Sequence, residues 1–386
     1  MRNGDYMNIF IAIDSFKGSL SSLQAGNAAA EGIRRVFPDA HIHIAPVADG
    51  GEGTAEALVG ALNGQMQSVT VRDPLGRDIT SQYGIVPPHT AVMEMSAAAG
   101  LTLLAPQERD PRRTTTYGVG QMIRHAIGKG CRDFLIGIGG SATNDGGAGM
   151  LQALGFDLLD GSGQPIPYGA AGLAALREIR CDNAMPELAE CSFRIACDVN
   201  NPLCGENGCS AVYGPQKGAD SAAVTEMDGW LARYARLVQS VFPAADPDTA
   251  GAGAAGGLGF AFLAFLNGTL VRGIDLVLQQ LNAAQHIAAA DLVITGEGRL
   301  DAQTVMGKAP AGIAALAKQY GKPVIAFAGS VTEQAKVCND HGIDAYFPIV
   351  RGVCTLEEAM DTANAAANLA DTAHQVFRLL QLSGTN

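Results

Sequence analysis

Apolar strand-like runs alternate with helix-patterned segments at both ends of this chain, and that alternation constrains the fold more than any other feature. Predicted strands cover residues 8–13, 42–47, 291–295, 323–327 and 345–350. Predicted helices cover residues 21–37, 52–62, 304–320, 333–339 and 356–382. Strands that alternate with helices form a parallel sheet with helices on both faces. The two ends of the chain therefore predict one α/β domain.

The middle of the chain follows a different pattern. Residues 67–71, 80–86 and 92–95 alternate between apolar and polar side chains and are joined by turn residues, which predicts antiparallel strands. Further along, the pattern predicts strands at 134–138 and 193–197 and helices at 116–127 and 222–241. With 386 residues, the chain is also too long for one ordinary core. We therefore predict an α/β domain formed by residues 1–66 and 289–386, interrupted by an inserted mixed α/β domain at residues 67–288.

Composition limits the partners that the protein can have. The net charge is −12 at pH 7, which argues against nucleic acid or an anionic membrane as a partner. Residues 249–271 carry no charge and are long enough to span a bilayer. Because their first half is rich in glycine, we interpret them as a buried loop that leads into a core helix. The N-terminus lacks the pattern of a signal peptide, so we expect a cytoplasmic protein.

Cysteines and histidines give no sign of a metal site. The eight cysteines form no CxxC pair, and no HExxH or related pattern occurs. We therefore expect reduced thiols in the core and no metal held by histidine or cysteine.

Four glycine-rich loops each carry a carboxylate. They read DSFKGS at residues 14–19, DGGEGT at 49–54, GGSATNDGG at 139–147 and GEGRLD at 296–301. Glycine allows backbone N–H groups to close around an oxyanion, but neighbouring carboxylates would repel a bare anion. A divalent cation between carboxylates and phosphate oxygens removes that conflict. The loops therefore predict a magnesium-bound nucleotide.

The loop at 139–147 also permits two other interpretations. Gly137, Gly139 and Ala142 match the looser dinucleotide fingerprint, which would indicate an oxidoreductase acting on a hydroxy acid. Asp145 beside the turn disfavours a metal-free pyrophosphate and favours a magnesium nucleotide. Asn144 and Asp145 could instead only cap the helix that follows. A nucleotide-binding sensor without catalysis is the third class of function, although the chain carries a full set of candidate catalytic groups.

Cationic side chains follow the predicted strands as well. There is no Walker motif and no protein-kinase signature, so any phosphoryl transfer uses another architecture. Lys17 follows the first strand, where ligands bind in open α/β sheets, or it is a solvated lysine of a turn. Arg299 has the residue type that grips a carboxylate, or it pairs with Asp301 on the surface. Lys217 lies in a further cationic loop.

Seven motifs together resemble the glycerate kinase type-1 family over nearly the whole chain. They are DSFKGSLS (14–21), PVADGGEGT (46–54), IGIGGSATNDGGAGM (136–150), ACDVNNPLCGENG (196–208), YGPQKGA (213–219), GAGAAGGLG (251–259) and ITGEGRLDAQTVMGKAP (294–310). The resemblance implies ATP- and Mg²⁺-dependent phosphorylation of D-glycerate, usually at the 2-hydroxyl, in glyoxylate or hexarate catabolism. It also implies a flavodoxin-like, Rossmann-type domain with an inserted domain of restriction-enzyme-like topology. The oligomeric state, monomer or homodimer, is left open.

A working assignment of roles follows from these loops and the resemblance. Nucleotide phosphates are expected at Gly139, Gly140, Ser141, Thr143 and Asn144. Mg²⁺ is expected at Asp145 together with Glu297 or Asp49, and Lys17 and Lys308 are expected to stabilise the transferring group. Glycerate is expected at Arg299, with Asp14, Ser15 and Asp301 beside it. Asp198 is the predicted base, with Asp14 and Asp301 as alternatives.

Overall fold

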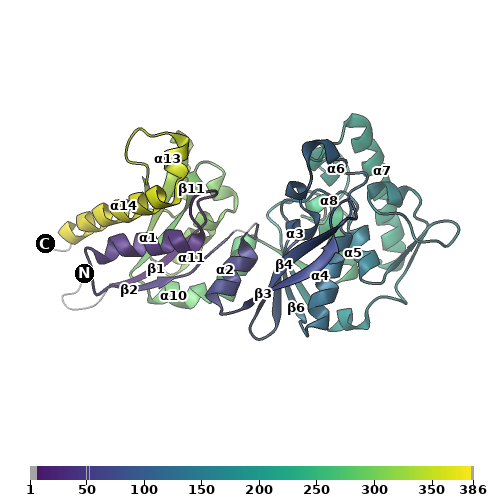
Figure 1. Ribbon diagram of the computed structural model, residues 1–386, viewed down its shortest axis with the longest axis horizontal. Helices are drawn as coiled ribbons and strands as arrows, with labels where there is room; N and C mark the ends of the chain where they lie inside the picture. The colour runs from purple at the N-terminus through teal and green to yellow at the C-terminus, as the bar shows by residue number, and fades with distance from the viewer. Residues whose placement is uncertain (1–6, 49, 52, 384–386) are drawn as a thin grey trace. The chain divides into compact units, whose positions relative to one another are not determined.

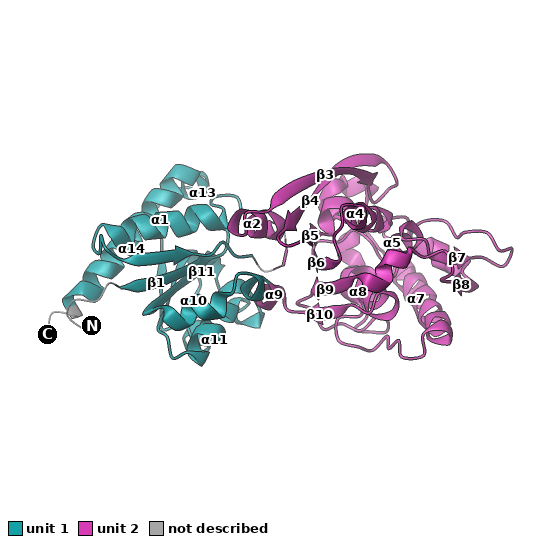
Figure 2. Ribbon diagram, turned by 90° about the horizontal axis from the view of Figure 1, so that it is seen from below, with its two compact units in different colours: residues 1–49, 277–386 teal, residues 50–276 magenta. Residues whose placement is uncertain are grey.

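The computed structural model describes residues 7–48, 50–51 and 53–383. The chain divides into two compact units, which we describe separately: unit 1 is Met1–Asp49 with Val277–Asn386, and unit 2 is Gly50–Leu276 (Figure 2). The boundaries expected after residues 66 and 288 differ from this division. Helix α2 (Thr54–Ala61) belongs to unit 2 because it packs on strand β4, where Gly84 leaves room for Val59, and Ala55 N donates to Glu94 of β5.

Unit 1 is built on a parallel sheet of five strands in the order β13-β12-β11-β1-β2. The strands are β1 (Asn8–Ile13), β2 (His41–Ile44), β11 (Leu292–Leu300), β12 (Val324–Val331) and β13 (Ala345–Pro348). Counted within the unit, this is the order 2-1-3-4-5 of flavodoxin-like folds. The predicted flavodoxin-like domain is therefore confirmed.

Helices cover both faces of this sheet. They are α1 (Ser22–Arg34), α10 (Ala283–Ala289), α11 (Ala309–Gln319), α12 (Val337–Asp340), α13 (Leu356–Met360) and α14 (Thr362–Ser383). Figure 1 shows α1 and α14 packed side by side, and Figure 2 shows them on one face of the sheet with α10 and α11 on the other. The close contact of α1 with α14 requires a glycine at position 32, because a Cβ there would lie 1.9 Å from the carbonyl oxygen of Ala370.

The long terminal helix predicted over 356–382 is two helices. The first, α13, ends at Met360, and Asp361 has an extended backbone. The Asp361 carboxylate accepts a hydrogen bond from Asn364 N at 2.9 Å, as an N-cap does for a new helix. The apolar period runs through this junction, which is why the sequence pattern alone did not reveal the break.

Unit 2 contains a mixed sheet of six strands in the order β10-β9-β6-β5-β4-β3. The strands are β3 (Gln65–Arg72), β4 (Asp78–Val86), β5 (Thr90–Glu94), β6 (Asp133–Gly137), β9 (Ser192–Ala196) and β10 (Thr269–Val271). β3, β4 and β5 are antiparallel as predicted, whereas β5, β6, β9 and β10 run parallel. A short antiparallel pair of β7 (Asp157–Leu159) and β8 (Glu178–Arg180) was not predicted. The mixed α/β insert is thus confirmed.

Helices of unit 2 pack around this sheet. They are α3 (Ser96–Ala99), α4 (Tyr117–Gly128), α5 (Ala148–Ala153), α6 (Cys209–Tyr213), α7 (Ser221–Val241) and α8 (Ala254–Phe265), and α9 (Gly273–Gln280) contains the division at Leu276. Short 3-10 turns of unit 2 lie at Leu101–Leu103, Pro106–Glu108, Ala170–Ala174, Pro186–Glu190 and Pro215–Lys217, and those of unit 1 lie at Thr304–Met306 and Glu333–Lys336.

The uncharged segment 249–271 forms a glycine-rich turn and the buried helix α8, as predicted, and ends in strand β10. Gly256 has a φ of +68° and lies so close to the chain that a Cβ would be 2.1 Å from the carbonyl oxygen of Thr143. Gly146 N also donates to Gly256 O at 2.9 Å. Among the described residues, no helix has both the length and the apolar character needed to cross a membrane.

Candidate active site

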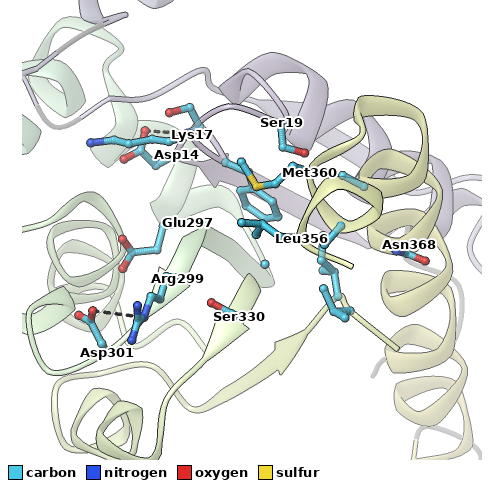
Figure 3. A pocket seen from close by; sticks show the side chains of 18 of the residues that line it. Asp14, Lys17, Ser19, Glu297, Arg299, Asp301, Ser330, Leu356, Met360 and Asn368 are labelled. Carbon is cyan, nitrogen blue, oxygen red and sulfur yellow. Dashed lines mark hydrogen bonds and ion pairs between the residues drawn. The ribbon is translucent and has the colours of Figure 1, made fainter. Parts of the chain in front are cut away.

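A cavity of about 400 Å³ opens in unit 1 at the carboxyl ends of β1, β11 and β12 (Figure 3). Ligands of open α/β sheets bind at this edge. The cavity is lined by all the predicted site residues in the described part of unit 1: Asp14, Ser15, Lys17, Glu297, Arg299, Asp301 and Lys308. Two loops that are far apart in the sequence therefore supply one charged site.

The first loop is a tight turn after β1. Phe16 N donates to Leu20 O at 2.8 Å, and both side chains are buried, so the turn is anchored by its apolar residues. Gly18 at its tip has a φ of +77°, which favours glycine. The carboxylate of Asp14 is buried and accepts a hydrogen bond from Ser15 N at 2.6 Å. Lys17 is exposed beside it.

The second loop was expected after a strand ending at residue 295, but β11 continues to Leu300. Gly296 makes this possible: it pairs with Phe327 of β12, and a Cβ there would lie 2.1 Å from the Phe327 carbonyl oxygen. Glu297 and Arg299 are therefore strand residues two positions apart. Strand pairing holds their backbone more rigidly than a loop would.

Glu297 is the most deeply placed carboxylate of the second loop. Its Oε1 accepts a hydrogen bond from the buried Thr304 hydroxyl at 2.6 Å, and Lys308 Nζ lies 3.4 Å from its Oε2. Burial raises the pKa of Glu297, while the bond from Thr304 and the charge of Lys308 oppose that rise. The site thus holds a partly desolvated carboxylate whose charged form is stabilised by a nearby cation.

Asp301 lies on the other side of the same lysine. Lys308 Nζ is 3.6 Å from its Oδ1, and Arg299 Nε is 3.9 Å from its Oδ2. The ion pair that was the alternative interpretation of Arg299 is thus present but long. Because the Arg299 side chain is 66% exposed, its guanidinium remains accessible to a ligand.

The predicted phosphate loop after β6 is partly exposed and partly buried. Gly139 and Gly140 are exposed, and Gly140 has a φ of +72°. Thr143 and Asn144 are fully buried, and Asn144 donates from Nδ2 to Ser210 Oγ at 2.8 Å. Only residues 139–141 can therefore offer the loop to a ligand without a rearrangement.

Lys217 is a residue whose importance the role assignment missed. It is buried, and its Nζ donates to Ser141 Oγ at 2.8 Å and to Thr143 O at 2.6 Å. Burial lowers the pKa of Lys217 to about 8. The motif YGPQKGA contains it, but no sequence signal shows that it lies beneath the glycine loop.

Asp145 occupies the buried end of the same loop. Its Oδ2 accepts hydrogen bonds from Thr116 N, Thr116 Oγ1 and Gly149 N at 2.8, 2.9 and 3.2 Å, and its Oδ1 accepts one from Gly147 N at 3.1 Å. Burial raises the pKa of Asp145, although these bonds oppose the rise. The capping role that was the structural alternative is therefore what the geometry displays. It argues against the predicted metal role.

The dinucleotide interpretation lacks its structural context. A dinucleotide fingerprint needs a strand, a tight turn and a helix in immediate succession. Here β6 ends at Gly137, but α5 begins only at Ala148, well beyond Ala142. The loop between them is held by long-range bonds rather than by a helix.

Two predicted residues stand apart from this geometry. Asp198 follows β9 in unit 2, is exposed, and accepts a hydrogen bond from Gly273 N at 3.1 Å. Asp49, a predicted metal ligand, lies outside the described residues, as does Glu52 of the same loop. Within the described ranges, no three His, Cys, Asp or Glu side chains form a group that could hold a metal by themselves.

Fold and site define an α/β protein of two units, in which the parallel-sheet unit carries a pocket of carboxylates and cations at the carboxyl ends of its strands. A family model described as the Glycerate kinase family matches residues 9–381, and the chain belongs to that family. The resemblance based on the seven motifs is thereby confirmed.

Individual relatives align over nearly their whole length. Glycerate 2-kinase of Escherichia coli (strain K12) is 46% identical over 372 residues, which are 95% of this chain and 98% of that protein. Glycerate kinase of Bacillus subtilis (strain 168) is 46% identical over 380 residues, covering 98% of this chain and 99% of its own. A crystal structure of a protein assigned as glycerate kinase 2 from Salmonella typhimurium LT2 has a TM-score of 0.92 at 46% identity, covering 99% of this chain and 100% of that chain.

Proposed function

We propose that the protein transfers the γ-phosphoryl group of ATP to the 2-hydroxyl of D-glycerate, giving 2-phospho-D-glycerate and ADP. The observation that carries the proposal is the unit 1 pocket, where two lysines and an arginine lie among three carboxylates. The choice of glycerate is supported by the names of the relatives. A cytoplasmic location is part of the proposal, since all eight cysteines are free thiols, as expected in a reducing compartment.

Charge neutralisation is the task that the two lysines suit. Phosphoryl transfer depends on positioning and on stabilising the charge of the transferring group. Lys308 Nζ lies between the carboxylates of Glu297 and Asp301 and is still 31% exposed. Lys17 is exposed on the neighbouring loop. Both ammonium groups therefore have access to phosphate oxygens while their backbones are fixed.

The carboxylates of unit 1 fit a magnesium ion by their chemistry. Mg²⁺ is usually held by one or two carboxylates together with substrate phosphates and water. We propose Glu297 and Asp301, with Asp14 beside them, and we remove Asp145 from the set because it is completely buried and both of its oxygens accept hydrogen bonds inside the protein. When bound, the ion would neutralise phosphate charge and orient the nucleotide. Thr304 fixes Glu297 for this role.

Substrate contacts and the base complete the proposal. The accessible guanidinium of Arg299 suits the glycerate carboxylate, which it could bind with two parallel hydrogen bonds. The exposed backbone at Gly139, Gly140 and Ser141, supported by Lys217, is the proposed phosphate contact of unit 2. Asp198 remains the proposed base. Substituting the true base by asparagine should lower kcat at least ~10²-fold with little change in KM.

The test is ³¹P NMR of the product formed from ATP, Mg²⁺ and D-glycerate. A new phosphorus resonance coupled to the C2 proton would support the proposal, and coupling to the C3 protons would mean that the 3-hydroxyl is the acceptor. A purified, folded protein that transfers no phosphate to D-glycerate would refute it. Turnover by Asp198→Asn near the wild-type rate would reject only the base and direct the search to Asp14 and Asp301.

A further inference from the structure

The unit 1 pocket has an apolar half that the proposed transfer chemistry does not use. Figure 3 shows Lys17, Glu297, Arg299 and Asp301 on one side and Met360 and Leu356 on the other. The apolar half is lined by Phe16, Ile349, Val350, Leu356, Ala359, Met360 and Ala365. Most of these residues come from the end of β13 and from the α13–α14 segment rather than from the charged loops.

Large apolar side chains in this half remain in contact with water. Leu356 is 79% exposed and Met360 is 37% exposed, although α13 could have placed polar residues there at no cost to the core. An exposed apolar wall within a pocket marks a surface that a ligand covers.

Glycerate cannot account for this wall. It is a small anion with an oxygen on every carbon, so its binding gains nothing from leucine and methionine. The cavity of about 400 Å³ has the size of sites for larger molecules, which combine an apolar lining with a few polar groups. A ligand with a flat apolar part and an anionic part would match both halves at once.

We propose that the apolar half binds the adenine ring of ATP, with the triphosphate directed toward Lys17 and Lys308. This inference rests on the proposed function, because it takes ATP as the phosphoryl donor. Asn368 lines the same end of the cavity, and its Oδ1 accepts bonds from Arg351 Nη2 and Nε at 3.0 and 3.3 Å. Held in this way, its amide nitrogen is the group that can donate to a ring nitrogen of the base.

The two halves of the pocket are joined mechanically. Thr362 Oγ1, just after α13, donates to Ser19 O at 2.9 Å, in the loop that carries Lys17. Met360 Cε lies so close to Gly18 that an added Cβ there would be 2.9 Å away. A capping box between Thr355 and Glu358 fixes the start of α13. The wall for the base and the loop for the phosphates are thus parts of one connected structure.

A pair of titrations separates the two halves. The first ligand is adenylyl imidodiphosphate with Mg²⁺, which has base and phosphates but does not react. The second is inorganic tripolyphosphate with Mg²⁺, which has phosphates only. Calorimetry of the Leu356→Ala/Met360→Ala variant should show about tenfold weaker binding of the first ligand, a change that corresponds to about 1.4 kcal/mol. Binding of tripolyphosphate should change less than about twofold, well under that increment.

Two further variants test the same idea from other directions. Ala359→Trp fills the apolar half instead of emptying it and should also weaken the nucleotide analogue selectively. Leu379→Ala is the matched control, because Leu379 is an exposed leucine of α14 outside the pocket lining. It should bind both ligands as the wild type does.

The outcomes distinguish this inference from the proposed function. Equal weakening of both ligands, or no change in either, would overturn the base site. If the double variant raises KM for D-glycerate but not for ATP, the apolar half serves the acceptor and the inference fails while the kinase stands. If the wild type transfers no phosphate, the function fails, yet the two titrations still decide whether a nucleotide base binds here.

Discussion

Unit 1 and unit 2 each contain a glycine-rich loop with an aspartate after a β-strand, but the two loops place their charged groups differently. In unit 1, Lys17 is exposed on its loop and Asp14 lines an open pocket. In unit 2, Asp145 is buried and accepts four hydrogen bonds, and Lys217 lies buried against the loop. The same sequence pattern therefore lines a pocket in one case and forms the scaffold of a loop in the other.

A carboxylate beside glycines is an ambiguous sign of a phosphate or metal site. A carboxylate that lines a pocket can exchange its present partners for a ligand, whereas one that is fully enclosed must have its lone pairs satisfied within the protein. Partners of Asp145 come from Thr116 and from residues at the start of α5. They convert a potential ligand group into a structural support.

The largest expected effect is on catalysis in unit 1. Lys308→Met removes the ammonium group between Glu297 and Asp301, so kcat/KM for ATP and glycerate should fall by roughly 10²–10³-fold. Thermal unfolding of the variant should resemble that of the wild type, because the side chain is partly exposed. Lys336→Met, an exposed lysine outside the pocket lining, is the control. A loss of activity below tenfold would mean that the Lys308 ammonium contacts no phosphate.

The next effect is on the stability of unit 2. Asp145→Ala leaves the N–H groups of Thr116, Gly147 and Gly149 without their acceptor, which should lower the free energy of unfolding by about 3 kcal/mol. The single tryptophan, Trp230, lies in α7 of unit 2, so its fluorescence in urea reports the unfolding of this unit.

Asp301→Ala is the matched change in unit 1. It should lower activity, while urea unfolding followed by circular dichroism should shift by less than about 1 kcal/mol. If both aspartate variants lose activity and neither loses stability, Asp145 has a direct catalytic part and the contrast between the two units is false.

The stability of unit 2 should depend on pH through Lys217. Burial lowers the pKa of Lys217 to about 8, so the folded state loses the proton before the unfolded state does. Stability relative to Lys217→Met should therefore be lowest below pH 8 and should rise by up to about 3 kcal/mol as the pH approaches the ordinary pKa of a lysine. Urea unfolding followed by Trp230 fluorescence across this range provides the measurement. A difference that does not vary with pH would show that the buried amine titrates as an exposed one.

Local patterns predicted most elements of both units. The apolar run at residues 8–13 coincides with β1, because a short, continuous apolar stretch is typical of a fully buried strand. Glycines at 296 and 298 suggested a loop, yet β11 continues through them, because Gly296 permits close pairing with β12. The break at Asp361 depends on a single cap within an unbroken apolar period.

The candidate site likewise contains residues that the sequence could predict and residues that it could not. Residues of the unit 1 pocket could be predicted because the carboxyl ends of parallel strands share one edge of the sheet. A residue that directly follows a predicted strand is therefore expected at that edge. The burial of Asp145 and Lys217 could not, since Lys217 meets Ser141 across 76 residues of sequence. Contacts of that range depend on tertiary packing, which a single sequence does not display.

The smallest effect concerns Thr304, a positioning residue. Its hydroxyl accepts from Asp301 N at 3.1 Å and donates to Glu297 Oε1, so Thr304→Val removes both bonds while keeping the shape. Without the donor the pKa of Glu297 should rise further above its usual range, because burial then acts with less opposition. A carboxylate with a raised pKa is protonated at low pH, so the acid limb of kcat/KM should move to higher pH, and the loss of activity should be larger at pH 6 than at pH 8. Thr304→Ser restores the hydroxyl and should restore the wild-type profile. A uniform loss at every pH, left unrepaired by serine, would instead assign Thr304 to packing and separate the rigidity of this site from its electrostatics.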